Sequence, residues 1–251
     1  MGGIVEKMAF HPPPHQRSAK KRIDRVWLTS SVGHHFPCVL VRKDSPRYMI
    51  YSHGNAEDIN QLEDWIHELS DILDINIIAW EYSGYGDSRI SEYDYQSPIV
   101  PKESYCYSNV VAVYDHLIAQ GVRPESIISF GRSLGTGPAI ELAVRRSRIG
   151  GLILQSPLTS AMRVVQSTGI TLPMDIFTNI DKIKNIYVPT LVIHGTDDSV
   201  IPISHGKKIF GAIPHRYKVS CFIKGADHNN IESDYSDLYA DCLQTWINSM
   251  P

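Results

Sequence analysis

A serine stands between two glycines near the middle of the chain, in the stretch Gly131-Arg132-Ser133-Leu134-Gly135. An apolar run at 127–130 precedes it and a helical pattern follows it. Small residues around such a serine permit a sharp turn from strand to helix, which presents the hydroxyl oxygen for attack on a carbonyl carbon. We therefore predict that Ser133 is a nucleophile.

This glycine-rich turn has two other interpretations. A turn that only packs a strand against a helix is one alternative, because the five-residue pattern also arises by chance. A phosphate-binding loop is disfavoured, since Gly135 and Gly137 begin a G-x-G but Ile140 stands where a third small residue is needed, and no Gly-Lys-Ser/Thr occurs.

A serine hydroxyl needs a histidine as its base, and the histidine needs a carboxylate that orients it. In the α/β-hydrolase fold these residues follow one another in the order serine, acid, histidine. Two carboxylates, Asp197 and Asp198, come just after a predicted strand at 190–194. Either position suits the acid, and the other interpretation of Asp197 is that it caps the helix that follows.

Three histidines follow the two acids: His205, His215 and His228. Only His228 comes after a strand pattern, at 219–223, and a tight turn, so that it would reach the same sheet edge as Ser133. His205 lies in a helical stretch and His215 in a loop after a proline, and we expect both at the surface. His228 is therefore the predicted base.

The tetrahedral intermediate of acyl transfer needs hydrogen-bond donors for its negatively charged oxygen. In this fold one donor is the backbone N–H of the residue after the nucleophile, here Leu134, and the other lies in the loop after the third strand. His53-Gly54-Asn55 occupies that loop, so we predict the Asn55 N–H as the second donor. We expect His53 to shape the loop as a packed, hydrogen-bonded residue.

Strand and helix patterns alternate along most of the chain. Residues 1–22, which contain a triple proline, are expected to form an extended arm, and 23–251 a single domain. Strands are predicted at 25–30, 38–43, 48–52, 76–80, 127–130, 152–155, 190–194 and 219–223, the later ones apolar throughout as in strands buried on both faces. Helices are predicted at 59–73, around 110–118, after Ser133 and at 232–246. The alternation predicts an α/β fold with a mostly parallel, doubly wound eight-stranded sheet and helices on both faces.

The segment 158–188 is longer than an ordinary connection and is rich in apolar residues. We interpret it as a short cap or lid over an acyl pocket, with Met162, Ile176 and Phe177 as candidate substrate contacts. One more packed crossover helix is the alternative.

The composition excludes several classes of protein. With 251 residues, 43% of them hydrophobic and 20% charged, the chain suits one large globular domain. A net charge of −3 argues against a nucleic-acid partner. A short basic run near the N-terminus is either a solvated edge or a weak peripheral contact for an anionic membrane: Arg17, Lys20, Lys21, Arg22 and Arg25.

The cysteines and the apolar runs indicate the compartment. Cys38, Cys106, Cys221 and Cys242 are far apart and lack metal-ligand spacing, so we expect reduced thiols and no metal site. No apolar run approaches the length of a membrane span, and the first residues lack a signal-peptide core. The expected location is intracellular and cytoplasmic, with at most peripheral membrane contact.

Several motifs together identify a family resemblance. From about Ala9 to the C-terminus the chain resembles the alpha/beta-hydrolase domain-containing protein 17 family, in the stretches Ser52-His53-Gly54-Asn55-Ala56-Glu57-Asp58, Tyr82-Ser83-Gly84-Tyr85-Gly86, Gly131-Arg132-Ser133-Leu134-Gly135-Thr136-Gly137-Pro138, Ser156-Pro157-Leu158-Thr159-Ser160, His194-Gly195-Thr196-Asp197-Asp198, Ser204-His205-Gly206 and Gly225-Ala226-Asp227-His228-Asn229-Asn230-Ile231-Glu232.

The resemblance carries specific implications. Family members are serine hydrolases that remove S-palmitoyl groups from membrane-associated proteins. By position, the resemblance makes Ser133 the nucleophile, His228 the base and Asp198 the acid, since the family's acid is the third residue after the glycine of His-Gly. One departure is that animal members have a palmitoylated, cysteine-rich N-terminal segment, whereas residues 1–22 here contain no cysteine.

The expected function is hydrolysis of acyl thioesters or esters through an acyl-serine intermediate, without a metal or organic cofactor. A palmitoylated protein is the favoured substrate. One alternative is a small-molecule carboxylesterase or monoacylglycerol lipase that uses the same residues on a lipid ester. An alternative of another class is a non-catalytic α/β-hydrolase scaffold that binds a partner.

Overall fold

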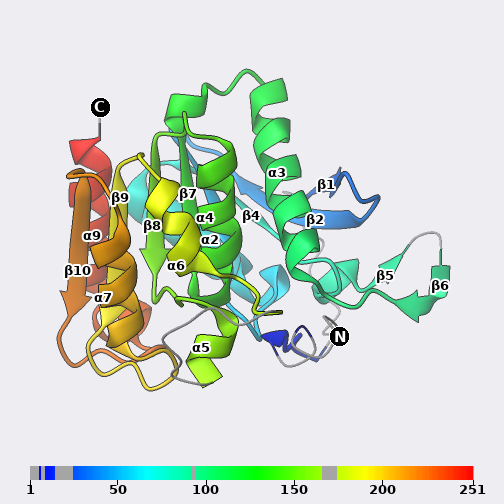
Figure 1. Ribbon diagram of the computed structural model, residues 1–251. Helices are drawn as coiled ribbons and strands as arrows, with labels where there is room; N and C mark the ends of the chain where they lie inside the picture. The colour runs from blue at the N-terminus through cyan, green and yellow to red at the C-terminus, as the bar shows by residue number, and fades with distance from the viewer. Residues whose placement is uncertain (1–5, 7–8, 15–24, 92–93, 166–173, 251) are drawn as a thin grey trace. The chain divides into compact units, whose positions relative to one another are not determined.

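The structure is a computed structural model that describes residues 6, 9–14, 25–91, 94–165 and 174–250. Its contacts divide the chain into two compact units, Met1–Ile127 and Ile128–Pro251. All eight strands predicted from the sequence are present, four in each unit (Figure 1). The predicted α/β fold is confirmed, whereas the single domain at 23–251 stays a prediction.

Some predicted segments fall outside the described residues. They include much of the arm at 1–22, four residues of the basic run (Arg17, Lys20, Lys21 and Arg22), and residues 166–173 of the predicted cap. Within the described part of the chain, no helix has both the length and the apolar character needed to cross a membrane.

In the first unit the main strands lie in the order β1-β2-β4-β3. β1 (Arg25–Thr29) and β2 (His35–Val41) form an antiparallel hairpin, and β2 also pairs antiparallel with β4 (Asn76–Trp80). β4 pairs parallel with β3 (Tyr48–Ser52), in the register Tyr48 to Asn76. The mixed part of the sheet is thus confined to its first strands. A small hairpin that the sequence did not predict joins β5 (Ile90–Ser91) and β6 (Asp94–Pro98).

Two helices pack on these strands: α2 (Ile59–Leu73) and α3 (Glu103–Ala119). Asp58 caps the start of α2: its carboxylate accepts hydrogen bonds from the backbone N–H groups of Asn60 and Gln61, which a helix start otherwise leaves unpaired. The helix is followed by its C-cap residue Asp74 in the left-handed conformation, with φ of 50°. The side chains that recur at helical spacing, such as Ile59, Ile66 and Leu73, are buried, as their spacing predicted.

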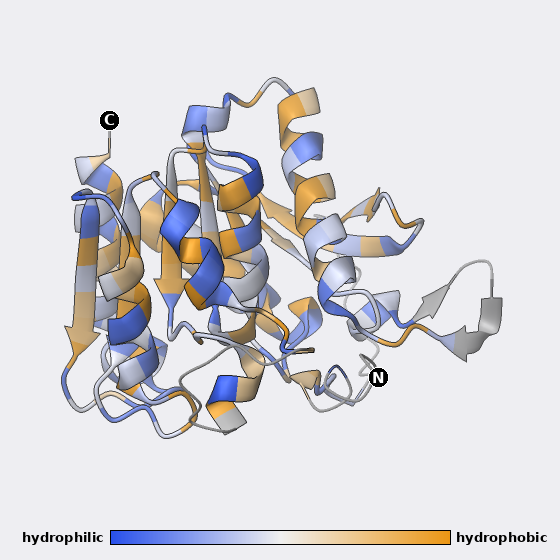
Figure 2. Cartoon of the chain, viewed as in Figure 1, coloured by the Kyte–Doolittle hydropathy of each residue, from blue (hydrophilic) through white to orange (hydrophobic). Residues whose placement is uncertain are grey.

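The second unit contains four parallel strands in the order β7-β8-β9-β10. β7 (Ile127–Arg132), β8 (Gly151–Gln155) and β9 (Thr190–Gly195) are buried along their whole length. Hydrophobic residues run along these strands, whereas the helices of this unit mix hydrophobic and hydrophilic residues (Figure 2). The crossovers include α4 (Thr136–Arg145), which packs on β8, and α7 (Ile203–Ala212), which packs on β9.

Two expectations about the end of the chain need correction. β10 (Lys218–Ile223) is buried only at Ile223, because it is the last strand in this order and, in the described part of the chain, pairs with β9 alone. The helix predicted at 232–246 is two helices, α8 (Ile231–Asp234) and α9 (Ser236–Ser249), separated by Tyr235 at a non-helical φ of −123°.

The cysteines also differ from expectation. Cys221 of β10 and Cys242 of α9 form a disulfide, so the prediction of four reduced thiols was wrong for this pair. Their separation of 21 residues gives no sign of contact, which arises only because α9 packs on β10. Cys38 and Cys106 are free and buried, as expected.

The predicted cap at 158–188 is described only in part. It contains α5 (Ala161–Val165), α6 (Asn179–Lys182) and the 3-10 turn η4 (Ile183–Asn185). α6 packs against α4 and α7, and the assignment of the whole segment as a cap or as a crossover helix stays a prediction. Phe177, just before α6, is completely buried and lies against Gly137 of α4.

This close packing generates a test. Gly137→Ala should lower the free energy of unfolding by about 1–3 kcal/mol, because a Cβ there would lie 2.8 Å from Phe177 Cε1 in a filled core. Urea denaturation measures the loss, and adding Phe177→Leu should recover most of it. Gly211→Ala in α7 is the matched control, since its Cβ would meet nothing within 4 Å and should be neutral or stabilising. A loss that the second substitution leaves unchanged would contradict this account.

Candidate active site

Ser133 lies at the carboxyl end of β7, in the left-handed conformation with a φ of 53°. The 3-10 turn η3 (Ser133–Gly135) follows and leads directly into α4. A Cβ on Gly131 would lie 2.6 Å from the Thr136 Cα, so only glycine allows the helix to start this close to the strand. The strained φ at a non-glycine residue is typical of functional sites.

The structure brings together the three side chains that the sequence singled out. The His228 Nε2 lies 3.1 Å from the Ser133 Oγ, and the His228 Nδ1 lies 2.8 Å from the Asp198 Oδ2. All three residues are buried. Such a chain of contacts can move a proton from the hydroxyl to the imidazole while the carboxylate stabilises the resulting positive charge.

Of the two candidate acids, only Asp198 contacts His228. Asp197 is exposed, and its carboxylate accepts a hydrogen bond from the Thr196 hydroxyl at 2.8 Å. Nor does Asp197 cap the next helix, since α7 has Pro202 at its N-cap and no side-chain cap hydrogen bond. The local sequence allowed Asp197 to be either the acid or a helix cap, and neither role is observed.

Asp198 is surrounded by donors. Its Oδ1 accepts hydrogen bonds from the backbone N–H groups of Val200 and Ile201, at 3.0 and 2.6 Å. Burial alone would raise the pKa of the Asp198 carboxyl, but hydrogen bonds from His194 and His228 and from the Ile201 N–H outweigh it and hold that pKa well below its usual range. The group is therefore a carboxylate at neutral pH.

Arg132, directly before Ser133, holds the loop that carries His228. Its Nε donates to Glu232 at 2.8 Å, and its Nη2 donates to the His228 carbonyl oxygen at 3.3 Å. Glu232 also accepts from the Gln155 Nε2 at 2.7 Å. A guanidinium with several fixed donors suits this bridging position, which the local sequence around Ser133 does not reveal.

The two other histidines considered as bases, His205 and His215, have different partners. His205 was expected at the surface, but it is buried, and its Nδ1 contacts the Thr159 N–H and hydroxyl at 3.2 and 3.0 Å. Burial, aided by Lys208, lowers the pKa of His205 to about 4. The expectation failed because the helical pattern shows which face His205 occupies but not what packs on that face. His215 is half-buried, and its Nδ1 accepts from the Tyr217 N–H at 3.1 Å.

The two predicted oxyanion donors lie in different units. Leu134 is the second residue of η3, immediately after Ser133. Asn55 belongs to the first unit and follows β3 in the chain; its side-chain Oδ1 accepts from the Tyr85 hydroxyl at 2.8 Å, and its Nδ2 donates to the Ala9 carbonyl oxygen at 2.7 Å. These contacts fix the Asn55 side chain, while the role of its N–H stays a prediction.

His53 has the packed, hydrogen-bonded environment expected of it. The side chain is completely buried, its Nδ1 lies 2.8 Å from the Gly54 carbonyl oxygen, and its Nε2 lies 3.0 Å from the Glu81 Oε1. Both ring nitrogens thus face acceptors, which favours the doubly protonated form. Burial would lower the pKa of His53, but the hydrogen bond and charge of Glu81 and the charge of Glu57 raise it above its ordinary value.

The candidate substrate contacts differ in exposure. Phe177 and Ile176 are buried, and Phe177 belongs to the packing of the segment on α4. Met162 is partly exposed at the start of α5, and its N–H donates to the Asp175 carboxylate at 3.0 Å. Contact of any of them with an acyl chain stays a prediction.

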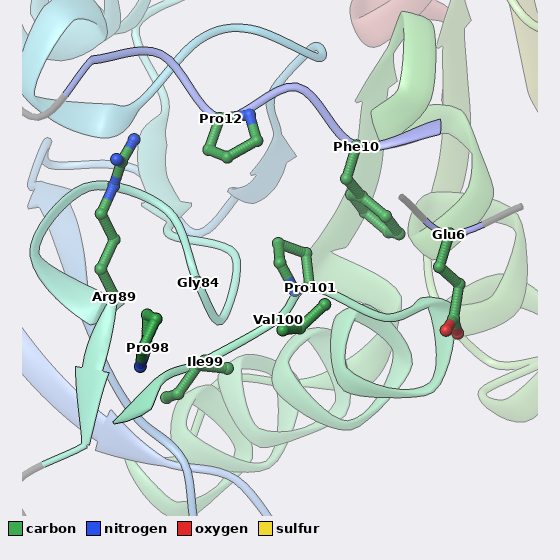
Figure 3. Close-up of a pocket in the computed structure, with 9 residues that line it drawn as sticks. All are labelled: Glu6, Phe10, Pro12, Gly84, Arg89, Pro98, Ile99, Val100 and Pro101. Atoms are coloured by element: carbon green, nitrogen blue, oxygen red, sulfur yellow. The ribbon is translucent and has the colours of Figure 1, made fainter. Parts of the chain in front are cut away.

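A cavity of about 360 Å³ lies in the first unit and contains none of the predicted site residues. Figure 3 shows its mainly apolar wall, which is formed by Glu6, Phe10, Pro12, Gly84, Arg89, Pro98, Ile99, Val100 and Pro101. Among the described residues, no group of three or more His, Cys, Asp or Glu side chains is arranged to hold a metal ion.

Known proteins similar to this chain are α/β hydrolases. No family model matches it. It is 37% identical to the human alpha/beta hydrolase domain-containing protein 17B, over 92% of this chain and 86% of that protein. It is 35% identical to a putative alpha/beta hydrolase of Acanthamoeba polyphaga mimivirus, over 90% and 87%. The Caenorhabditis elegans alpha/beta hydrolase domain-containing protein aho-3 is 34% identical, over 98% and 78%.

Solved structures share the fold at low sequence identity. An esterase from Pyrococcus furiosus superposes with a TM-score of 0.74 at 15% identity, over 96% of this chain and 99% of that one. A monoacylglycerol lipase from Paleococcus ferrophilus superposes with a TM-score of 0.63 at 16% identity, over 85% and 98%. These likenesses establish the fold and leave the substrate open.

The buried His53 generates a prediction about pH. Because its pKa is higher in the folded than in the unfolded state, His53 contributes stability that is complete below about pH 6.5 and is lost as the pH rises through its folded pKa. The difference in unfolding free energy between the wild type and His53→Gln should therefore shrink from pH 6 to pH 9. Urea denaturation at a series of pH values measures it.

His116→Gln is the matched control in the same unit. Burial lowers the pKa of His116, so this histidine is neutral in both states above about pH 7 and its variant should differ from the wild type by a constant amount there. A His53→Gln difference that stays equally constant would contradict the charged His53.

Proposed function

The chain belongs to the alpha/beta-hydrolase domain-containing protein 17 family of α/β hydrolases, and we propose that it cleaves acyl thioesters or esters through an acyl-serine intermediate. The single observation that carries the proposal is the continuous contact from the Ser133 Oγ through His228 to Asp198, at 3.1 and 2.8 Å. Along the chain the three residues follow one another as serine, acid and histidine, which is the order that this fold uses.

The proposed reaction begins with proton transfer. The His228 Nε2 takes the hydroxyl proton as the Ser133 Oγ bonds to the carbonyl carbon, and Asp198 stabilises the imidazolium that forms. The negative oxygen of the tetrahedral intermediate accepts from the N–H groups of Leu134 and Asn55. As the intermediate collapses, the bond to sulfur or oxygen breaks, and the leaving thiol or alcohol takes the proton from His228.

The second half returns the enzyme to its starting state. His228 removes a proton from water, whose oxygen attacks the acyl carbon, and the acid product leaves as Ser133 regains its proton. None of these steps calls for a metal ion or an organic cofactor.

The substrate class rests on the sequence motifs. Their resemblance to the family implies removal of palmitoyl groups from protein cysteines, which is a thioester hydrolysis. We propose a palmitoylated protein as the substrate on that basis. A second candidate function, suggested by the esterase and the lipase that share the fold, is that of a carboxylesterase or monoacylglycerol lipase. It would use the same three catalytic side chains.

A fluorophosphonate probe tests the nucleophile. The wild type should become labelled, because an activated serine oxygen displaces fluoride from phosphorus, and Ser133→Ala should not. His228→Gln should slow labelling by about 10²-fold or more. Ser129→Ala is the matched control on the same strand, where the buried hydroxyl donates to the Ala139 carbonyl oxygen and should leave labelling unchanged. Labelling that persists in Ser133→Ala would overturn the assignment, and an inert wild type would favour the non-catalytic scaffold.

Hydrolysis rates on substrates with different acyl groups test which acyl group the enzyme removes. We expect a higher kcat/KM on a palmitoyl-thioester peptide than on acetyl or butyryl esters. A strong preference for the short esters would refute the depalmitoylase assignment in favour of a carboxylesterase, and a preference for monoacylglycerol would indicate a lipase. Ser133→Ala should abolish whichever activity is found.

A further inference from the structure

A second histidine contacts the carboxylate of Asp198. His194 is the penultimate residue of β9, and its side chain is completely buried. Its Nε2 lies 3.3 Å from the Asp198 Oδ2, the same oxygen that the His228 Nδ1 contacts. The proposed mechanism assigns no role to this imidazole.

The partners of His194 indicate which ring nitrogen donates. The Nε2 lies 2.8 Å from the Ile201 carbonyl oxygen and near Asp198, and both are acceptors, so Nε2 carries a proton. The Nδ1 is buried and has no hydrogen-bond partner among the described residues. A proton on Nε2 satisfies these contacts, whereas a proton on the Nδ1 would lack an acceptor.

The ring of His194 is held in place by the helix beyond it. Gly206 of α7 lies directly against the ring, where a Cβ would come within 3.1 Å of Cγ and still closer to the Nδ1. Because α7 packs on β9, the imidazole is confined between the two elements. Its Nε2 can therefore act as a fixed donor toward the turn that carries Asp198.

Asp198 and His194 both hydrogen-bond to the backbone of Ile201, in the turn that follows β9. The Asp198 Oδ1 accepts from the Ile201 N–H at 2.6 Å, and the Ile201 carbonyl oxygen faces His194 at 2.8 Å. Without the imidazole, the carbonyl would lose this buried partner, and among the described residues the Oδ2 of Asp198 would keep only its contact with His228. The backbone contacts restrain one carboxylate oxygen, and His194 restrains the other.

We propose that His194 is a positioning residue, which fixes the Asp198 carboxylate so that its Oδ2 faces the Nδ1 of His228. The inference rests on the proposed function of the site and adds a residue to it. The role is carried by hydrogen bonding and confinement, and His194 itself forms no contact with substrate because its side chain is not exposed.

The electrostatics of Asp198 agree with this geometry. Burial raises the pKa of its carboxyl, whereas hydrogen bonds from His194 and His228 lower it. The two imidazoles therefore act together to keep a buried carboxylate ionised.

Three variants test the proposal by steady-state kinetics. His194→Leu should lower kcat by about 10–100-fold, because a displaced acid no longer orients the base, while KM stays within about twofold. His194→Gln carries a donor near the position of Nε2 and should recover most of kcat. Gly206→Ala, which pushes on the ring without removing it, should reproduce part of the kcat loss.

His205→Asn is the matched control. His205 is also a buried histidine of this unit, but its ring contacts Thr159 rather than Asp198, so the variant should lose stability while keeping kcat within about threefold. If His194→Leu and His205→Asn lower kcat equally, or if His194→Gln is as slow as His194→Leu, the positioning role is overturned.

A second readout separates this inference from the proposed function. The proton on the His228 Nδ1 gives a low-field ¹H NMR signal when it is held by a carboxylate, and His228→Gln identifies the signal by its loss. The signal should broaden or disappear in His194→Leu and persist in His194→Gln. An unchanged signal in His194→Leu would refute the inference whether or not the protein hydrolyses esters, whereas an inert wild type with the expected signals would refute the proposed function alone.

Discussion

The parallel pairing of β7, β8, β9 and β10 is the constraint on which the candidate site depends. Parallel strands end at the same edge of a sheet, so residues that follow β7, β9 and β10 meet there although 95 residues separate Ser133 from His228. The register Leu154 to Val192 and Cys221 to Ile193 keeps these strands level with one another. A shift of one residue would turn every side chain to the other face and would separate the three groups.

Bringing these groups to one edge also buries charge, and the surrounding contacts offset that cost. An unpaired buried carboxylate or guanidinium is strongly unfavourable. Asp198 receives donors on both oxygens, and Arg132 places donors on Glu232 and on the His228 carbonyl oxygen. The same contacts that make burial tolerable also determine where the side chains lie, so stability and catalytic geometry have a common origin.

Particular residues show how far the sequence could predict this arrangement. Ser133 and His228 were identified because local patterns, a strand followed by a sharp turn, place each at a strand end. Asp198 and Asp197 could not be separated by such patterns, since adjacent residues of a turn differ only in the direction of their side chains. Burial of His205 and the Cys221–Cys242 disulfide depend on which elements pack together, and spacing along the chain does not reveal that. The bridging role of Arg132 was missed for the same reason.

Separate contacts hold the backbone and the side chain of His228. Arg132 and Ser133 are adjacent in the chain, so the guanidinium that holds the His228 carbonyl oxygen ties the backbone of the base to the strand of the nucleophile. The Asp198 carboxylate acts on the other part of the residue, because its contact at the Nδ1 determines how the ring is rotated. Arg132 thus fixes the position of His228, and Asp198 fixes the direction of its Nε2. The 3.1 Å contact between this Nε2 and the Ser133 Oγ is therefore not needed to hold the imidazole in place. The hydroxyl is then free to leave that hydrogen bond when it attacks a carbonyl carbon, which a nucleophile must do in every cycle.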